Sequence, residues 1–175
     1  MQLVEMVSPS DYMTTSDDKS GYWQMAMHPD SWKYLAFKSA GKVYCWVVAA
    51  FGLMDLPYKF TIAKQVVYQP LRQMGAQLLS MLDDRAAVES TLPRARLQVE
   101  ALNSVLVALG TVLNIPDASG KKAQWLPSQR ITFLGFEVDA RQQSFSLLQR
   151  RRGTWRKQCK PYCRQIQYPT GCWPR

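Results

Sequence analysis

The feature that most constrains this fold is a pair of acidic segments, each next to a strand-like run. Asp83 and Asp84 lie in the sequence LLSMLDDRAAV, and Asp17 lies in TTSDDKSGYWQ. Neighbouring carboxylates at a turn between apolar strands repel one another and lose hydration, so a partner must offset the cost. A divalent cation is the usual partner, since Mg²⁺ prefers oxygen ligands. Two such ions about 3.5 to 4 Å apart promote displacement at phosphorus, so phosphoryl or nucleotidyl transfer is the first hypothesis.

Charge is distributed unevenly along the 175 residues. The formal net charge is +9, from 22 Lys and Arg against 13 Asp and Glu. Residues 141–175 hold nine of the basic residues and none of the acidic ones. A basic tail favours a polyanion such as nucleic acid, while an acidic membrane surface and plain disorder are alternatives. We therefore expect one domain over residues 1–148 and a basic, disordered tail over 149–175.

The four cysteines do not indicate a disulfide framework in a chain of this size. Cys45, in an apolar run, is expected in the core. The spacing of Cys159, Cys163 and Cys172 matches no common zinc site. The first residues lack a signal-peptide pattern, and the longest apolar run, 43–54, is too short to span a bilayer. We therefore predict an intracellular protein, cytoplasmic or nuclear, that is neither secreted nor bound to a membrane.

Hydrophobic periodicity predicts an α+β fold. One helix is expected to begin near Asp55 and Pro57 and to end at Gly75, and a second to run from Pro93 to Gly110. A loop is expected around Pro116, Gly120 and Pro127. Strands are expected at 11–17, 33–38, 42–48, 78–81, 85–88, 130–138 and 144–148. Both acidic segments then fall at strand ends, where an antiparallel sheet with helices packed on one face would hold the carboxylates rigidly.

With these motifs placed, the chain resembles the palm of a reverse transcriptase, an RNA-directed DNA polymerase, from a retroelement of the long-terminal-repeat or tyrosine-recombinase type. The resemblance covers residues 11–148 and rests on five motifs in the family's order. These are DDKSGYWQ at 17–24, MHPDS through Phe37, FGL with Pro57 and FT at 51–61, the Asp83-Asp84 pair, and LPSQ with FLGF at 126–136.

The resemblance implies a catalytic and metal-binding role for Asp17, Asp83 and Asp84, with Mg²⁺ or alternatively Mn²⁺ as the cofactor. It also implies that Tyr22 is the aromatic gate that excludes a ribose 2′-hydroxyl. The expected substrates are dNTPs and a DNA primer on an RNA or DNA template. No particular protein partner is indicated.

Further roles follow from the same resemblance. Phe51 and Gly52 match the loop that packs on the incoming nucleotide. Lys122 matches a lysine near the triphosphate, and the neighbouring Lys121 is the alternative. The segment Leu134, Gly135 and Phe136 matches the hairpin that grips the primer.

The chain departs from the family pattern at several positions. Met81 stands where a tyrosine is usual, and Asp18 stands where an apolar residue is usual. Strand alternation directs Asp18 toward the core, where an unpaired carboxylate would be destabilising or protonated. The fingers and thumb are expected to be largely missing, as in a truncated, retrotransposon-derived fragment. A catalytically inactive palm remnant that only binds nucleic acid is therefore the alternative, and a metal-dependent nuclease is a third candidate.

Overall fold

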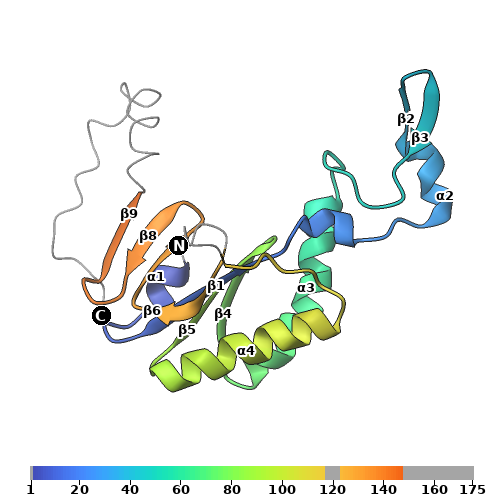
Figure 1. Ribbon diagram of the computed structural model, residues 1–175. Helices are drawn as coiled ribbons and strands as arrows, with labels where there is room; N and C mark the ends of the chain where they lie inside the picture. Colours follow the sequence, from blue (N-terminus) through green and yellow to red (C-terminus); the bar gives the residue numbers. More distant parts are fainter. Residues whose placement is uncertain (1, 117–122, 148–175) are drawn as a thin grey trace, which may run out of the picture.

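The computed structural model describes residues 2–116 and 123–147, and its centre is a four-stranded antiparallel sheet. In spatial order the strands are β4 (Gln77–Met81), β5 (Asp84–Glu89), β1 (Tyr12–Asp17) and β6 (Gln124–Ser128). Strands β4 and β5 form a hairpin around the acidic pair, as the sequence predicted. The α+β class is confirmed, with helices and antiparallel sheets in one body (Figure 1).

Two long helices share one face of this sheet. Helix α3 (Leu56–Gln73) has Pro57 in its first turn, and Gly75 follows its end with a φ of 94°, a conformation that glycine adopts without strain. Helix α4 (Leu92–Ala108) runs along the same face. The core between helices and sheet consists of Tyr68, Leu78, Ala87, Leu102, Leu106 and Leu113. Both helices agree closely with the predicted ranges.

The opposite face carries a short helix and a second, smaller sheet. Helix α1 (Gln2–Met6), which no sequence pattern indicated, lies there with strands β7 (Arg130–Phe133), β8 (Phe136–Asp139) and β9 (Ser144–Leu147). Since side chains alternate along β5, Ala86 and Val88 point to this face and Ala87 to the helices. The core on this face contains Leu3, Val7, Met13, Ala86, Val88, Ile131, Phe133, Val138 and Ala140.

Residues 25–54 form an arm that projects away from the sheet (Figure 1). The arm follows the 3-10 helix η1 (Gly21–Gln24) and contains, in order, α2 (Pro29–Trp32), the 3-10 helix η2 (Lys33–Leu35), β2 (Ala36–Ser39) and β3 (Lys42–Cys45). The predicted hairpin is confirmed, with shorter strands. Cys45 is exposed, contrary to expectation, because both strands of this hairpin are exposed to solvent.

Two predictions after α4 were wrong. Part of the expected loop forms β6, which tolerates Pro127 because it lies at the edge of the sheet, where a missing N–H donor matters less. The long strand expected over 130–138 is divided by Leu134 and Gly135, whose φ values are 50° and 83°. Consecutive positive φ values are typical of two-residue hairpin turns. Over residues 2–116 and 123–147, no helix is long and apolar enough to cross a membrane.

Candidate functional site

The three aspartates singled out in the sequence lie at the same end of the central sheet. Asp17 is the last residue of β1 and pairs in register with Asp84, the first residue of β5. Asp83 lies in the turn between β4 and β5, and its carbonyl oxygen accepts a hydrogen bond from the backbone N–H of Asp18 at 3.1 Å. Antiparallel pairing thus brings Asp17 to the end of the sheet that carries Asp83 and Asp84, which follow it by 66 and 67 residues in sequence. Their catalytic role stays a prediction.

The charged forms of Asp17 and Asp84 are disfavoured where they lie. Burial, followed by the charges of Asp17 and Asp83, raises the pKa of Asp84 to about 6, against an opposing effect of Arg85. Burial also raises the pKa of Asp17, with a further rise from the charge of Asp83, while a hydrogen bond from Asn114 lowers it. Such a group of mutually repelling, half-buried acids is typical of functional sites.

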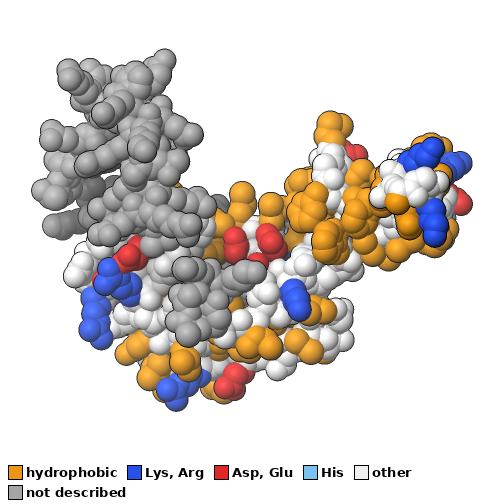
Figure 2. All heavy atoms as spheres, turned by 45° about the horizontal axis from the view of Figure 1, so that its top comes forward, with side chains coloured by type: hydrophobic (Ala, Val, Ile, Leu, Met, Phe, Trp, Pro, Cys, Tyr) orange, Lys and Arg blue, Asp and Glu red, His pale blue; other side chains and the backbone are white. Residues whose placement is uncertain are grey.

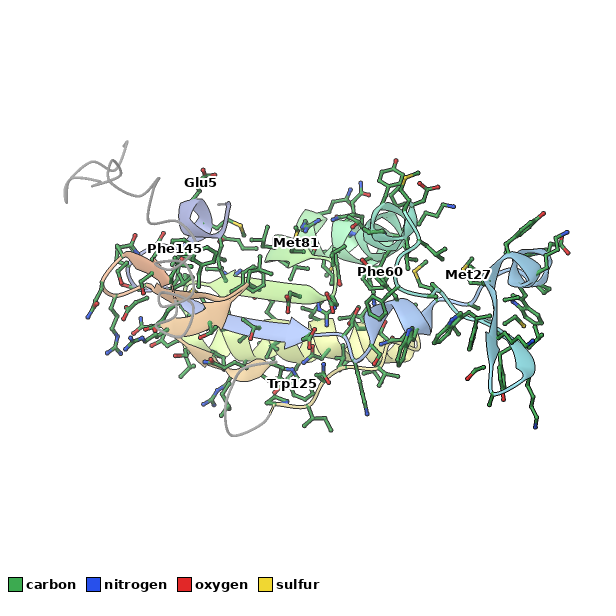
Figure 3. The ribbon with its side chains drawn as sticks, turned by 90° about the horizontal axis from the view of Figure 1, so that it is seen from above. Glu5, Met27, Phe60, Met81, Trp125 and Phe145 are labelled. Carbon is green, nitrogen blue, oxygen red and sulfur yellow. The ribbon has the colours of Figure 1, made fainter. Side chains whose placement is uncertain are left out.

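The turn that carries Asp83 is tightly held. Leu82 has a φ of 55°, which costs free energy in a residue other than glycine. Gly21 packs against the same turn, because a Cβ atom added to it would lie 3.3 Å from Asp83 Cβ and 3.0 Å from Phe60 Cζ. In Figure 3, Phe60 and Met81 lie at the end of the sheet that faces the arm. The site is therefore at the junction between sheet and arm.

An aromatic cluster adjoins this end of the sheet. The ring of Tyr22 lies 5.3 Å from that of Phe51 and 5.2 Å from that of Phe60. Phe60 is buried, whereas Phe51 is 69% exposed, and Gly52 next to it has a φ of 99°. The sequence predicted Tyr22, Phe51 and Gly52 as nucleotide-binding residues. The structure joins Tyr22 and Phe51 to Phe60, which lies with Asp83 against Gly21.

The cluster continues along the arm as a row of contacting rings that the sequence analysis did not identify. Trp23 contacts Phe51 and stacks on Trp46, and Phe37 links Trp46 to Tyr44. All five of these rings are partly exposed to solvent. Figure 2 shows hydrophobic side chains continuing from the body of the molecule onto the arm, close to a small group of acidic side chains.

The sequence analysis missed two polar interactions at the site, the hydrogen bond from Asn114 to Asp17 and the pairing of Asp18 with two cations. Asn114 donates a hydrogen bond from Nδ2 to Asp17 Oδ2 at 2.5 Å, and it lies in a loop after α4 that has no recognisable pattern. Asp18 is buried as expected but is paired, because Arg85 Nη1 lies 2.7 Å from one carboxylate oxygen and Lys64 Nζ lies 2.8 Å from the other. Arg85 follows the acidic pair directly in sequence, which was the available signal.

The remaining predicted residues do not join this group by any described contact. Leu134 and Gly135 form the β7–β8 turn, and Phe136 stacks on Phe145 with ring centroids 4.5 Å apart. Leu134 packs against the core that contains α1. Lys122, the basic tail from residue 149 and its three cysteines lie outside the described residues.

The aspartates match a divalent cation in donor chemistry, because hard ions prefer oxygen ligands. In the part of the chain that the structure describes, the carboxylates of Asp83 and Asp84 have no hydrogen bond or ion pair that competes for their oxygens. Across those same residues, however, no three His, Cys, Asp or Glu side chains are gathered closely enough to hold a metal ion. The donors fit a cation, but they do not form a preassembled site.

Comparison with curated proteins finds viral polyproteins. The chain is 30% identical over 137 residues to the enzymatic polyprotein of Cestrum yellow leaf curling virus, covering 78% of this chain and 20% of that protein. It is 27% identical over 128 residues to the Pro-Pol polyprotein of simian foamy virus type 1, covering 73% of this chain and 10% of that protein. The chain therefore spans a fifth or less of these relatives. No protein-family model matches it.

Comparison with solved structures identifies a shared fold. The foamy viral protease-reverse transcriptase in complex with an RNA/DNA hybrid matches with a TM-score of 0.71 at 20% identity, covering 97% of this chain and 21% of that one. The same protein in complex with dsDNA matches with a TM-score of 0.68 at 22% identity, covering 90% and 29%. The resemblance proposed from the motifs is therefore supported by overall sequence and by overall fold.

Proposed function

We propose that this chain, which is homologous over most of its length to the reverse transcriptase-like region of retroviral and pararetroviral polyproteins, is the palm of an RNA-directed DNA polymerase. The observation that carries the proposal is the meeting of Asp17, Asp83 and Asp84 at one end of the central sheet. Catalysis of nucleotidyl transfer depends mainly on positioning and on neutralisation of charge, and a rigid sheet end is suited to both.

Asp17, Asp83 and Asp84 are the residues that would hold the divalent cations. When bound, Mg²⁺ or Mn²⁺ would lower the pKa of the primer 3′-hydroxyl and neutralise charge on the triphosphate. The mutual repulsion of the carboxylates, which contributes to the raised pKa of Asp84, gives them a reason to bind cations. Because the three side chains are not preassembled, binding has to draw them together.

The aromatic cluster provides a surface for the incoming nucleotide. Tyr22 is held between Phe51 and Phe60, so its ring has little freedom to move and can reject a ribose 2′-hydroxyl by steric exclusion. The exposed ring of Phe51 is free to contact a base. Gly52, next to it, has a positive φ, a backbone conformation that most other residues do not adopt. The sheet would thus supply the charged groups, and η1 together with residues 51 and 52 of the arm would select the nucleotide by its shape.

A catalytically inactive palm that only binds nucleic acid is the second candidate. It is favoured by the lack of a formed metal-binding group among the described residues. The arm offers exposed aromatic rings together with Lys33, Lys38 and Lys42, a combination that suits single-stranded nucleic acid.

Primer extension distinguishes the two candidates. The purified chain is incubated with dNTPs, Mg²⁺ or Mn²⁺ and a labelled DNA primer on an RNA template, alongside Asp83→Asn and a control, Glu100→Gln, at an exposed position on α4. We expect extension by the wild type and the control, loss in Asp83→Asn, and loss on chelation of the metal. Extension that persists in Asp83→Asn would contradict the assigned site, and shortening of the primer would indicate a nuclease.

Absence of extension by the wild type, with binding that survives Asp83→Asn and weakens steeply with salt, would favour the inactive remnant instead.

A further inference from the structure

Directly beside the three carboxylates lies a second charged group, the buried ion network, formed by Asp18, Lys64 and Arg85. Arg85 Nη1 lies 2.7 Å from Asp18 Oδ1, and Lys64 Nζ lies 2.8 Å from Asp18 Oδ2. Arg85 Nη1 also donates to the hydroxyl of Tyr68 at 3.1 Å, and Lys64 Nζ donates to Thr111 Oγ1 at 3.2 Å. The network therefore joins β1, β5, α3 and the loop after α4.

The network is costly to bury, which makes its presence informative. The side chains of Asp18 and Arg85 are 0% and 1% exposed, and that of Lys64 is 12% exposed. A buried ion pair is often no more stable than apolar residues of similar volume, although removal of one partner alone is strongly destabilising. Within the described residues, Arg85 Nε and Nη2 have no hydrogen-bond partner. Stability alone therefore does not explain why two buried cations surround one carboxylate here.

The network's place in the fold indicates what it does. Asp17 and Asp84 form the last pair in the register of β1 and β5. Asp18 directly follows Asp17 in sequence, and Arg85 directly follows Asp84. The ion pair between Asp18 and Arg85 therefore links β1 to β5 where the regular ladder ends. The backbone N–H of Asp18 also donates to the carbonyl oxygen of Asp83. The network is therefore attached, through Asp18 and Arg85, to the backbone next to all three carboxylates.

We propose that the buried ion network positions the three carboxylates by locking the end of β1 to the start of β5 and to α3. The importance of this positioning for catalysis rests on the proposed function. The attachment of β1 to β5 and α3 by the network does not depend on that function. Asp18, Lys64 and Arg85 are positioning residues, because they act through their neighbours. The charge of Arg85 also opposes the rise in pKa of Asp17 and Asp84.

The first test replaces Lys64, which is the most exposed member and therefore the safest to change. Lys64→Met is compared with Lys59→Met, an exposed position on the same helix. Amide hydrogen exchange is measured over residues 15–19 and 81–86. We expect exchange there to accelerate about tenfold in Lys64→Met and to be unchanged in Lys59→Met, as for a local opening. Equal exchange in the two variants would overturn the proposal.

Mn²⁺ binding by the same two variants separates positioning from simple charge. Removing a nearby positive charge without moving the carboxylates would tighten Mn²⁺ binding. Loss of positioning predicts the opposite, and we expect Lys64→Met to weaken Mn²⁺ binding about tenfold while Lys59→Met leaves it unchanged. Tighter binding by Lys64→Met would overturn the proposal. No Mn²⁺ binding by the wild type would contradict the proposed function, and the exchange measurement would then decide the positioning proposal by itself.

A double-mutant cycle tests whether the two most buried members act as a unit. Asp18→Leu leaves the buried Arg85 without its carboxylate, and Arg85→Leu leaves the buried Asp18 with Lys64 as its remaining ion-pair partner. Each single variant is expected to lower the thermal midpoint by roughly 10 °C or more. The double variant Asp18→Leu/Arg85→Leu is expected to recover at least half of that loss. Additive losses in the double variant would show that the two residues do not act through each other, and would overturn the proposal.

Discussion

Asn114 donates a hydrogen bond from its side-chain amide to Asp17, 97 residues earlier in the chain, at 2.5 Å. The backbone N–H of Asn114 also donates to the carbonyl oxygen of Asp17 at 2.9 Å. The loop after α4 is thus attached at two points to the end of β1. The side-chain bond holds one of the two oxygens of this carboxylate in place.

Asn114→Ala is expected to lower the free energy of unfolding by about 1 kcal/mol, because one partly buried hydrogen bond is lost. Primer extension is expected to fall at least about tenfold, since Asp17 is no longer held in position. Urea unfolding and extension assays check the two effects.

The matched control is Asn103→Ala. Asn103 accepts a hydrogen bond from the hydroxyl of Ser16 at 3.1 Å, one residue before Asp17. We expect a similar loss of stability but little loss of extension. Equal losses of extension in both variants would assign Asn114 a general structural role.

Stability is expected to fall as pH rises from about 4 to about 6, because the pKa of Asp84 is raised from 3.8 to about 6 on folding. Between these values the folded state binds more protons than the unfolded state, so a rise in pH favours unfolding. Asp84→Asn reduces this dependence, to which Asp17 with its raised pKa also contributes, and is expected to stabilise the protein at pH 7 by about 1 kcal/mol after allowance for solvent screening. Urea unfolding at pH 4 and pH 7 measures both. A destabilised Asp84→Asn variant at pH 7 would be evidence against this account.

Gly21→Ala is expected to destabilise the protein by about 1 to 3 kcal/mol. The added Cβ would lie 3.0 Å from Phe60 Cζ, and Phe60 is 1% exposed, so its ring cannot move aside easily. Thermal unfolding gives the magnitude. The double variant Gly21→Ala/Phe60→Leu is expected to be less destabilised than the sum of the single variants, because leucine lacks the clashing atom. Strict additivity would argue against a direct clash.

Tyr22→Ala is expected to raise incorporation of ribonucleotides relative to deoxyribonucleotides by about tenfold or more, because the ring that excludes the 2′-hydroxyl is removed. Tyr22→Phe keeps the ring between Phe51 and Phe60 and is expected to keep the discrimination. Single-nucleotide incorporation assays check both. Tyr34→Ala, at a position 78% exposed on the arm, is the control. Unchanged discrimination in Tyr22→Ala would refute the gate.

Local patterns were sufficient for most of the elements. The strand before Asp17, the hairpin around the acidic pair and both long helices follow from alternation, helical periodicity and the residues at their ends. After α4, the errors occurred where one or two residues were misinterpreted. Pro127 was assigned to a loop although an edge strand accommodates it, and Leu134 with Gly135 was assigned to a strand although the pair forms a turn.

The sequence by itself determined the α+β class, the strand ends on which the aspartates lie and the family resemblance, because these depend on residues close together in the chain. Only the tertiary structure decided which partners those aspartates have. Asn114 reaches Asp17, and Arg85 with Lys64 neutralises Asp18, through contacts between segments far apart in sequence. Such contacts are set by sheet register and helix packing, which no local pattern encodes. Asp18, which strand alternation directs toward the core, is for that reason the centre of an ion network.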